Sequence, residues 1–430
     1  MIVQADRYEI SFAAIEAIGR EAAVEAIGVA GAEPFHDLMP LLRRYYEEGR
    51  SSGFEHPLGE QRVDPNTLLP GAQSIVSIAV PYRTRQTVAM RRPRGRRGVV
   101  SAYAWGRDYH PVLKEKLRMV ADLLERACGR AIRSLPCVDT TPLVDRAVAE
   151  RAGIGFIGKN CMVITKAYGS WVFLGALLTD VRIEPQSRLS PMSMDSCGDC
   201  ELCLTACPTG ALREPFVLDS QSCLSYLTQS KGMIAEEYRT ALGRRVWGCD
   251  TCQTVCPKNH VSLLGEETAF TPDPELSFPD LKRILRLSGR TFMREFGHTA
   301  AAWRGFSVWR RNAIIALGNM RDPEALPLLL PLLSDTRPEI RASAAWALSR
   351  IDIDGASAPS TTGKNIRLRR YSGIDIHGAC APPTTGKKMR LRRFSGMADA
   401  SVRDAVRAAY GDEHDEAVRQ EMEWAAPPKP

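Results

Sequence analysis

The 430-residue chain is 44% hydrophobic and 25% charged, which is typical of a globular, soluble protein with two or three domains. No apolar run is long enough to span a bilayer and no basic-then-apolar leader opens the chain, so we expect a cytoplasmic protein. The net charge is +7, but residues 357–396 hold nine Lys or Arg and one acid, so the rest of the chain is near −1 (7 − 8). Overall charge therefore does not by itself indicate a nucleic-acid surface.

The N-terminal part alternates helical and strand-like segments. We expect strands at 27–30, 74–82, 161–165 and 171–179, and helices within 1–40 and at 112–128. Thr141 followed by Pro142 predicts the N-cap and first turn of a further helix, which Gly153 ends. This alternation predicts an α/β domain over residues 1–185.

Two cysteine clusters follow this domain, and each ends in a Cys-Pro pair. The cysteines of the first cluster, spaced C-x2-C-x2-C-x3-C, are Cys197, Cys200, Cys203 and Cys207. Those of the second, spaced C-x2-C-x3-C, are Cys249, Cys252 and Cys256, and Cys223 stands alone between the groups.

This pattern is that of a bacterial ferredoxin, in which three close thiolates bind one [4Fe–4S] cube and the Cys before Pro reaches the other. Soft, anionic thiolates suit iron–sulfur iron. A pair of structural zinc sites is the alternative, but zinc does not call for the Cys-Pro endings or the tight triple. A disulfide framework is disfavoured in a long cytosolic chain. We therefore predict a ferredoxin-like module with two clusters over residues 186–265.

The C-terminal part, residues 280–430, is predicted to be helical. Arg310, Ala313, Ala316 and Leu317 recur 31 residues later, which indicates a short HEAT-like repeat with a partner helix near 325–333. A basic segment at 358–373 returns at 381–396. Its Pro, Gly, Ser and Thr content predicts a duplicated, disordered insertion at 357–396, which is either passive or bound to nucleic acid. The whole chain is thus expected to be an α+β multidomain protein.

Clusters carry single electrons and do not specify a reaction, so the N-terminal domain should hold the reaction centre. Asp139 is the candidate acid, although a residue just before a helix could equally serve as a cap. Tyr109 and His110 could line a pocket, and Lys159 could contact an anion; each has an ordinary structural role as the alternative. The glycines near residue 155 do not match a dinucleotide-binding fingerprint.

Several strings together resemble one family. They are VDTTPLVDRAVAERAGIGFIGKN at 138–160, SCGDCELCLTACPTGAL at 196–212, SCLSYLTQSKG at 222–232 and WGCDTCQTVCPKN at 247–259. With the HEAT-like tail, they look like epoxyqueuosine reductase over residues 1–350 and the final helices. That family reduces the epoxide of epoxyqueuosine at the tRNA wobble position to queuosine, with a corrinoid and two [4Fe–4S] clusters. The duplicated insertion is foreign to the family pattern.

The resemblance implies roles for individual residues. Cluster one would be held by Cys197, Cys200, Cys203 and Cys256. Cluster two would be held by Cys207, Cys223, Cys249 and Cys252. Asp139 matches the proton donor. The residues expected near the corrinoid (cobalamin) of this α/β domain are Arg62, Ser101, Asp139, Ser225 and Asp250; some relatives carry a cysteine where Ser101 stands.

The implied mechanism passes electrons through the clusters to the cobalt and on to the epoxide, while Asp139 protonates the departing oxygen. The expected partners are a tRNA with epoxyqueuosine at the wobble position and an unidentified electron donor. We expect a monomer and no membrane association. Two alternatives remain open: a reductive dehalogenase, which also joins a corrinoid to two clusters, and a ferredoxin-type electron carrier with a scaffold domain.

Overall fold

The computed structural model describes residues 8–91, 93–185, 194–351 and 400–425. These residues form two compact units, and each unit is assembled from separate stretches of the chain. Unit 1 comprises Met1–Thr87, Gly106–Cys223 and Asp250–Thr271; unit 2 comprises Val88–Trp105, Leu224–Cys249 and Pro272–Pro430. The predicted duplicated insertion at 357–396 lies outside the described residues.

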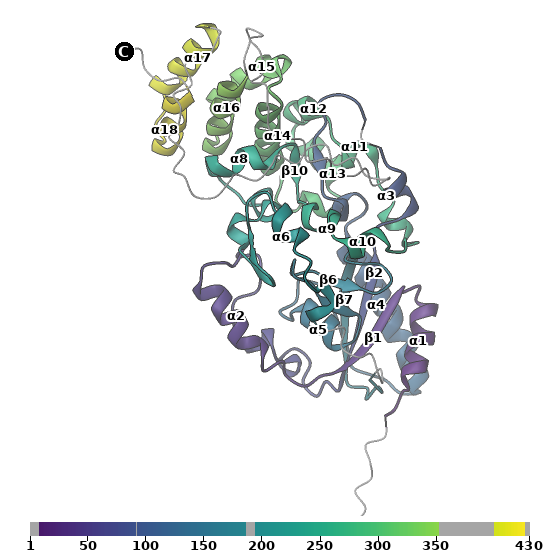
Figure 1. The fold of residues 1–430 in the computed structure, drawn as a ribbon. Helices are drawn as coiled ribbons and strands as arrows, with labels where there is room; N and C mark the ends of the chain where they lie inside the picture. The colour runs from purple at the N-terminus through teal and green to yellow at the C-terminus, as the bar shows by residue number, and fades with distance from the viewer. Residues whose placement is uncertain (1–7, 92, 186–193, 352–399, 426–430) are drawn as a thin grey trace, which may run out of the picture. The chain divides into compact units, whose positions relative to one another are not determined.

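Unit 1 contains a four-stranded sheet with helices on both faces (Figure 1). Its strands, in spatial order, are β1 (Ala26–Gly31), β2 (Ser74–Pro81), β7 (Val172–Thr179) and β4 (Ser134–Cys137). Its principal helices are α1 (Phe12–Glu21), α2 (Leu38–Glu47), α4 (Tyr109–Cys128) and α5 (Asp145–Arg151). A separate hairpin pairs β5 (Gly155–Ile157) with β6 (Val163–Thr165). The short helix α3 (Arg85–Ala89) crosses the boundary between the units.

The strand pairing corrects one prediction. Every pair in the four-stranded sheet is antiparallel, with Ile75 opposite both Ala30 and Leu178. The alternation of helices and strands predicted an α/β domain, a class built on parallel strands. The unit is instead α+β, because its helices are combined with a sheet whose strands all pair antiparallel. The predicted helices and strands themselves are confirmed, with shifts of a few residues at their ends.

The two faces of β7 are covered by different helices. A Cβ on Gly175 would lie 3.2 Å from the Leu117 side chain of α4, so this glycine permits close contact between helix and sheet. The next residue, Ala176, points to the opposite face, where it packs with Val148 of α5. Every residue of β2 is buried, including Ser74 and Ser77, so both faces of this strand are covered.

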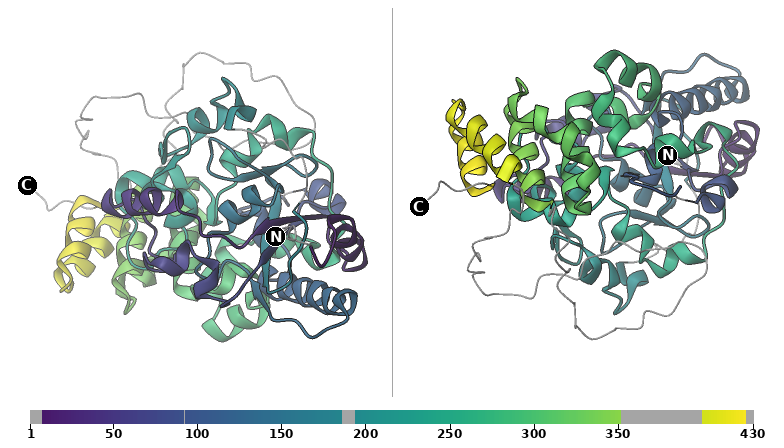
Figure 2. Two further views of the ribbon diagram at one scale, coloured as in Figure 1. Left: turned by 90° about the horizontal axis from the view of Figure 1, so that it is seen from below. Right: turned by 90° about the horizontal axis from the view of Figure 1, so that it is seen from above.

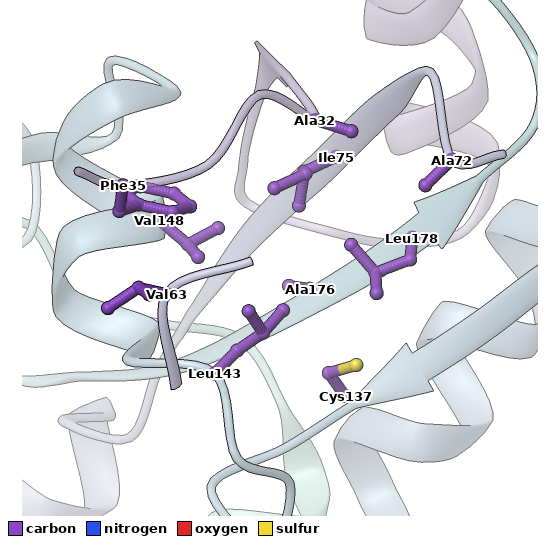
Figure 3. Packing of buried hydrophobic residues seen from close by; sticks show 10 residues of the cluster. All are labelled: Ala32, Phe35, Val63, Ala72, Ile75, Cys137, Leu143, Val148, Ala176 and Leu178. Carbon is purple, nitrogen blue, oxygen red and sulfur yellow. The ribbon is translucent and has the colours of Figure 1, made fainter. Parts of the chain in front are cut away.

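The core on the α5 side holds both ends of the loop that carries Asp139. Cys137, at the end of β4, is fully buried, and Leu143 is 4% exposed. Figure 3 shows both side chains in the same apolar cluster, with Ile75 and Val148 close by. The loop that carries Asp139 is therefore tied to the core on either side.

The start of α5 differs from the prediction. Thr141 does not cap this helix: α5 begins at Asp145, its N-cap is Val144, and that cap makes no side-chain hydrogen bond. The residues from 139 to 143 form bends instead. Consequently Asp139 lies six residues before the helix and does not cap it. Gly153, with φ +76°, follows the helix end at Ala152 as expected.

The cysteine-rich part of unit 1 consists of short elements. They are α6 (Leu202–Ala206), β8 (Leu212–Glu214), β9 (Val217–Leu218), α9 (Thr251–Thr254) and α10 (Pro257–His260). Cys256 is the N-cap residue of α10, and Pro257 occupies its first turn, where a missing N–H costs nothing. The Cys-Pro ending of the second cysteine group thus marks a helix start. Packing of α6 against α9 brings the two cysteine groups side by side.

Unit 2 is largely helical. Its elements up to residue 300 are β3 (Val99–Val100), α7 (Leu224–Leu227), α8 (Glu236–Leu242), β10 (Arg245–Trp247), α11 (Pro274–Ser277), α12 (Leu281–Arg286) and α13 (Gly289–Phe296). Its later helices are α14 (Phe306–Met320), α15 (Leu326–Leu329), α16 (Pro338–Arg350), α17 (Ala400–Gly411) and α18 (Glu416–Ala425). Figure 2 shows α17 and α18, in yellow, beside the green repeat helices, in agreement with the packing of α16 against α18.

The 31-residue repeat corresponds to α14 and α16, which pack against each other. A Cβ on Gly318 would lie 2.8 Å from the backbone of Ala347, so glycine is needed for this close approach. The expected partner helix is confirmed as α15, but it is short and continues as a 3-10 turn at Leu330–Ser334. Pro331 accounts for the change, because proline cannot donate the helical hydrogen bond.

Among the described residues, no helix is both long enough and apolar enough to cross a membrane.

Candidate active site

Asp139 lies in the loop after β4, where the N-terminus of α4 meets it. Its carboxylate is 48% exposed and is contacted by two neighbouring side chains of α4. The Tyr109 hydroxyl donates to Asp139 Oδ2, and His110 Nε2 lies 2.6 Å from Asp139 Oδ1. This carboxylate is held by two donors and is half open to solvent, so it can relay a proton from His110 to a substrate.

His110 connects Asp139 to a second carboxylate. His110 Nδ1 lies 2.6 Å from Asp108 Oδ1, and Asp108 also caps α4 by accepting the His110 backbone N–H. Burial lowers the pKa of His110, but hydrogen bonds to Asp108 and Asp139 outweigh it and raise the pKa to about 9. Both ring nitrogens face carboxylate oxygens, so the ring is an imidazolium at neutral pH. His110, hydrogen-bonded between Asp108 and Asp139, therefore carries a proton directly beside the exposed Asp139 carboxylate.

Tyr109 is held by aromatic packing. Its ring stacks on Phe173 of β7, with centroids 4.2 Å apart and planes 7° apart. Phe173 in turn contacts Tyr82 and Phe270 at 4.6 and 4.9 Å between centroids. This aromatic group fixes the phenol, so its hydroxyl is directed at Asp139 by the rigid sheet and not by a mobile loop.

A second carboxyl lies behind Asp139. Asp145 is half-buried at the first position of α5, and its Oδ1 atom is inaccessible and has no hydrogen-bond partner. Burial, followed by the negative charge of Asp139, raises the pKa of Asp145 to about 7. Asp145 therefore adds a group that is partly protonated at neutral pH next to the candidate acid.

Arg62 is linked to the same loop through His56. Arg62 is 8% exposed, its Nη1 donates to His56 O at 2.9 Å, and its buried Nε has no partner. The His56 ring reaches Thr140 O, 3.1 Å from Nε2. The positive charge of Arg62 also acts to lower the pKa of Asp145. Within unit 1 the structure thus brings Arg62 and the Asp139 loop into one connected region.

One group of four cysteines is close enough to interact electrostatically. Burial raises the pKa of Cys203 to about 11, and the neighbouring Cys197 and Cys256 raise it further. Burial likewise raises the pKa of Cys256, against the hydrogen bonds of its helix start, and Cys197 and Cys200 add to the increase. Iron binding would replace these protons and relieve the mutual repulsion of the sulfurs.

The remaining candidate ligands divide between the units. Cys207 and Cys252 pack around the apolar group formed by Cys161, Cys203 and Leu212 in unit 1. Cys223 follows a 3-10 turn in unit 1, whereas Cys249 belongs to unit 2. No three His, Cys, Asp or Glu side chains of the described residues converge tightly enough to hold a single metal ion.

The other predicted corrinoid residues also fall in both units. Asp250 in unit 1 precedes α9. In unit 2, Ser101 is 4% exposed and its N–H donates to Trp247 O at 2.8 Å. A Cβ on Gly248 would lie 2.4 Å from the Ser101 Cβ, so a glycine is required just before Cys249. Ser225 lies in α7, where its carbonyl accepts hydrogen bonds from Thr228 and Gln229.

Three contributors escaped the sequence analysis: Asp108, Asp145 and His56. Asp108 had a local signal, because aspartate is a preferred N-cap residue and stands directly before α4. Asp145 and His56 had none, since their importance comes from segments that only the fold brings to Asp139.

Comparisons with known proteins agree with this site. The family model described as Epoxyqueuosine reductase QueG, DUF1730 matches residues 62–140, which include Arg62, His110 and Asp139. The model of a 4Fe-4S double cluster binding domain matches residues 196–259, and HEAT repeats match 305–360. Fold and site together therefore define an iron–sulfur oxidoreductase with a helical-repeat tail.

The epoxyqueuosine reductase of Bacillus subtilis (strain 168) is 47% identical over 330 residues, covering 76% of this chain and 84% of the relative. The chain belongs to the epoxyqueuosine reductase family. It is similar to a crystal structure of an epoxyqueuosine reductase with an epoxyqueuosine-modified tRNA-Tyr stem loop, at 39% identity, a TM-score of 0.79, and coverage of 96% of this chain and 97% of that one. A Bacillus subtilis structure with its aspartate catalytic loop swung out of the active site is 38% identical, with the same TM-score and coverage.

Proposed function

We propose that this enzyme reduces the epoxide of epoxyqueuosine at the wobble position of tRNA, with Asp139 as the proton donor to the departing epoxide oxygen. The observation that carries the proposal is the pair of hydrogen bonds from Tyr109 and His110 to the half-exposed Asp139 carboxylate, in a chain of this family. The oxygen becomes alkoxide-like as its bond to carbon breaks, so an acid within hydrogen-bonding reach lowers the barrier.

The residues around Asp139 would manage the proton. His110 holds a proton between Asp108 and Asp139, and its raised pKa of about 9 keeps that proton available at neutral pH. His110 would pass its Nε2 proton to Asp139 Oδ1 across the 2.6 Å contact, and Asp139 would then give a proton to the substrate oxygen. Tyr109 orients the second carboxylate oxygen. The swung-out loop described for the Bacillus subtilis relative suggests that the loop between Cys137 and Leu143 opens and closes on its two core anchors.

The cysteines would hold two [4Fe–4S] clusters. We assign cluster one to Cys197, Cys200, Cys203 and Cys256, and cluster two to Cys207, Cys223, Cys249 and Cys252. The mutual electrostatic influence of the first four thiols supports their grouping. Thiolates are the ligands that such clusters require, and none of these cysteines forms a disulfide.

The described residues also fit a corrinoid. Arg62 Nε and Asp145 Oδ1 are buried polar atoms without partners, a state that proteins rarely tolerate unless a ligand or water satisfies it. A corrinoid carries amide side chains able to pair with such atoms. We propose that Arg62, Ser101, Asp139, Ser225 and Asp250 line its site. When bound, it would supply the reducing electrons to the epoxide carbons, received through the clusters.

The partners follow from this reaction. The stem-loop complex of a relative supports tRNA as the substrate, and the wobble nucleoside lies in an unpaired loop, from which it can enter a pocket. An electron donor must load the clusters. A cytoplasmic location and a monomeric state remain predictions from the sequence.

The decisive experiment uses full-length protein purified without oxygen. Iron, cobalt and a visible spectrum are measured first, and the protein is then incubated with a chemical reductant and tRNA that carries epoxyqueuosine. Mass spectrometry of the digested tRNA should show loss of one oxygen from the modified nucleoside. Intact epoxyqueuosine after incubation with iron- and cobalt-loaded protein would refute the proposed reaction.

The same experiment separates the alternatives. A reductive dehalogenase would contain both metals but leave tRNA unchanged and remove halide from an aryl halide. An electron carrier would contain iron without cobalt. Either result would contradict the proposed function, because the proposal requires both metals and the tRNA product.

A further inference from the structure

Trp303 is an exposed aromatic residue that the mechanism above does not use. It lies in unit 2, just before α14, and 55% of its surface is open to solvent. Tryptophan is rarely this exposed, because its large apolar surface favours burial or a binding partner. This position therefore calls for an explanation beyond folding.

The indole is held in a defined orientation. Trp303 Nε1 donates to Gln229 Oε1 at 3.1 Å. The Arg304 guanidinium lies 4.6 Å from the ring centroid, and its Nε donates to Gln229 O at 3.0 Å. An exposed ring that is fixed by a hydrogen bond and a cation–π contact loses little rotational freedom when a ligand stacks on it.

Gln229, which accepts the hydrogen bond of the indole, also contacts Ser225. Gln229 Nε2 donates to Ser225 O at 3.0 Å and lies 3.5 Å from Ser225 Oγ. The same segment is held by the fully buried Arg311 of α14, which donates to the carbonyls of Leu227, Ser230 and Gly232 at 3.0, 2.7 and 2.6 Å. The HEAT-like helix α14 thus holds the segment Ser225–Gly232 rigidly next to Trp303.

The two segments that meet at Trp303 carry a net positive charge. Segments 222–235 and 297–311 contain no Asp or Glu. Their cations are Lys231 and Arg304, together with Arg310, which is paired with Asp335, and Arg311, which is buried. Lys231 is exposed, and Arg304 is partly exposed. A fixed aromatic ring flanked by cations and free of nearby acids in these segments matches single-stranded nucleic acid, which offers base faces for stacking and phosphates for ion pairing.

We propose that Trp303 is a stacking platform for an unpaired base of the substrate tRNA loop, with Lys231 contacting an adjacent phosphate. This inference rests on the proposed function, because it takes the substrate to be a tRNA loop. It assigns Trp303 to substrate binding and not to proton transfer. Through Gln229, the platform also couples the bound RNA to the segment that carries Ser225.

The test compares Trp303→Ala, Trp303→Phe and Met293→Ala in full-length holoenzyme. Met293 is 52% exposed in the same unit and serves as the control for loss of exposed apolar surface. Affinity for a fluorescent anticodon stem loop is measured by anisotropy, and kcat and KM are measured with epoxyqueuosine tRNA. Iron content and thermal unfolding verify that each variant is folded and loaded.

Trp303→Ala should weaken binding and raise KM by roughly 5- to 150-fold, the range expected for one base–aromatic stack, with kcat nearly unchanged. Trp303→Phe should retain most of the affinity, because it keeps a stacking face while losing the Nε1 hydrogen bond. Lys231→Gln should reduce the slope of log affinity against log salt by about 0.7.

Unchanged affinity in Trp303→Ala, or a change no larger than that in Met293→Ala, would overturn the inference. An equal loss in Trp303→Phe and Trp303→Ala would also overturn it, since the hydrogen bond to Gln229 would then be the important feature. The wild-type protein separates this failure from that of the proposed function. If wild type reduces epoxyqueuosine tRNA and Trp303→Ala does so with the same KM, only the platform is wrong; if wild type leaves the epoxide intact, the proposed function is wrong.

Discussion

His110 Nε2 lies 2.6 Å from Asp139 Oδ1, and the opposite nitrogen of the same ring lies 2.6 Å from Asp108 Oδ1. This contact joins two segments about 30 residues apart: the start of α4 and the loop after β4. A histidine between two carboxylates keeps its proton well above its ordinary pKa, so the acid at the surface has a proton source directly behind it.

Replacement of Asp139 by Asn should abolish most turnover. The amide is nearly isosteric but cannot release a proton at neutral pH, so kcat should fall by about 10²–10⁴-fold. Iron content and corrinoid binding should be unchanged, as measured by metal analysis and the visible spectrum. Asp122→Asn, at an exposed position on α4, is the matched control and should keep wild-type turnover. Near-normal epoxide reduction by Asp139→Asn would remove Asp139 from the mechanism.

His110→Gln should change how stability depends on pH. The pKa of His110 rises from 6.5 to about 9 on folding, so the folded state holds the proton more tightly than the unfolded chain. The stabilisation is therefore complete below pH 6.5 and is lost as the pH rises through 9. Urea midpoints of wild type and His110→Gln should differ most at pH 6 and converge near pH 10. A constant difference across this range would show that His110 is not charged in the folded state.

Cys207→Ser should disturb the cluster assigned to Cys223, Cys249 and Cys252, because the Cys before Pro reaches the second cube. Electron paramagnetic resonance of the reduced protein should show one intact cluster signal, and iron should fall from about eight to about four atoms per chain. Cys128→Ser, at a half-buried position on α4, should keep both signals. Loss of only the cluster assigned to Cys197, Cys200 and Cys203 would show that the assignment is reversed.

Arg311→Met should strongly destabilise the protein. The guanidinium is 1% exposed and satisfies three backbone carbonyls, so its removal leaves those oxygens buried and unpaired. A loss of about 1–3 kcal/mol is typical when a buried acceptor is left without its donor. Thermal or urea unfolding measures the effect. Arg294→Met, at a side chain that is 75% exposed, should change stability by about 0.5 kcal/mol or less. Equal stability of the two variants would contradict the proposed anchoring of Ser225–Gly232.

The sequence by itself determined the features that depend on local spacing. The cysteine intervals identified a two-cluster module. The Cys-Pro ending of the second group proved to be a helix start because proline fits a first turn, whereas Cys207 of the first group ends α6. The 31-residue repeat predicted α14 and α16, since the spacing of apolar residues along the sequence indicates a helix directly. The family resemblance, carried by several independent motifs, is confirmed by the comparisons.

Only the tertiary structure decided which distant groups meet. The α/β prediction for the N-terminal domain implied parallel strands and was wrong, because apolar runs indicate burial and not whether strands pair parallel or antiparallel. Thr141 looked like a cap, yet the chain bends through residues 139–143, with Leu143 buried, and α5 starts only at Asp145. Asp145 and His56 lie near the Asp139 loop because separate segments pack together, and spacing in the sequence does not predict such packing. Likewise, α14 supports the Ser225 segment because Arg311 needs acceptors once it is buried, and carbonyls about 80 residues away provide them.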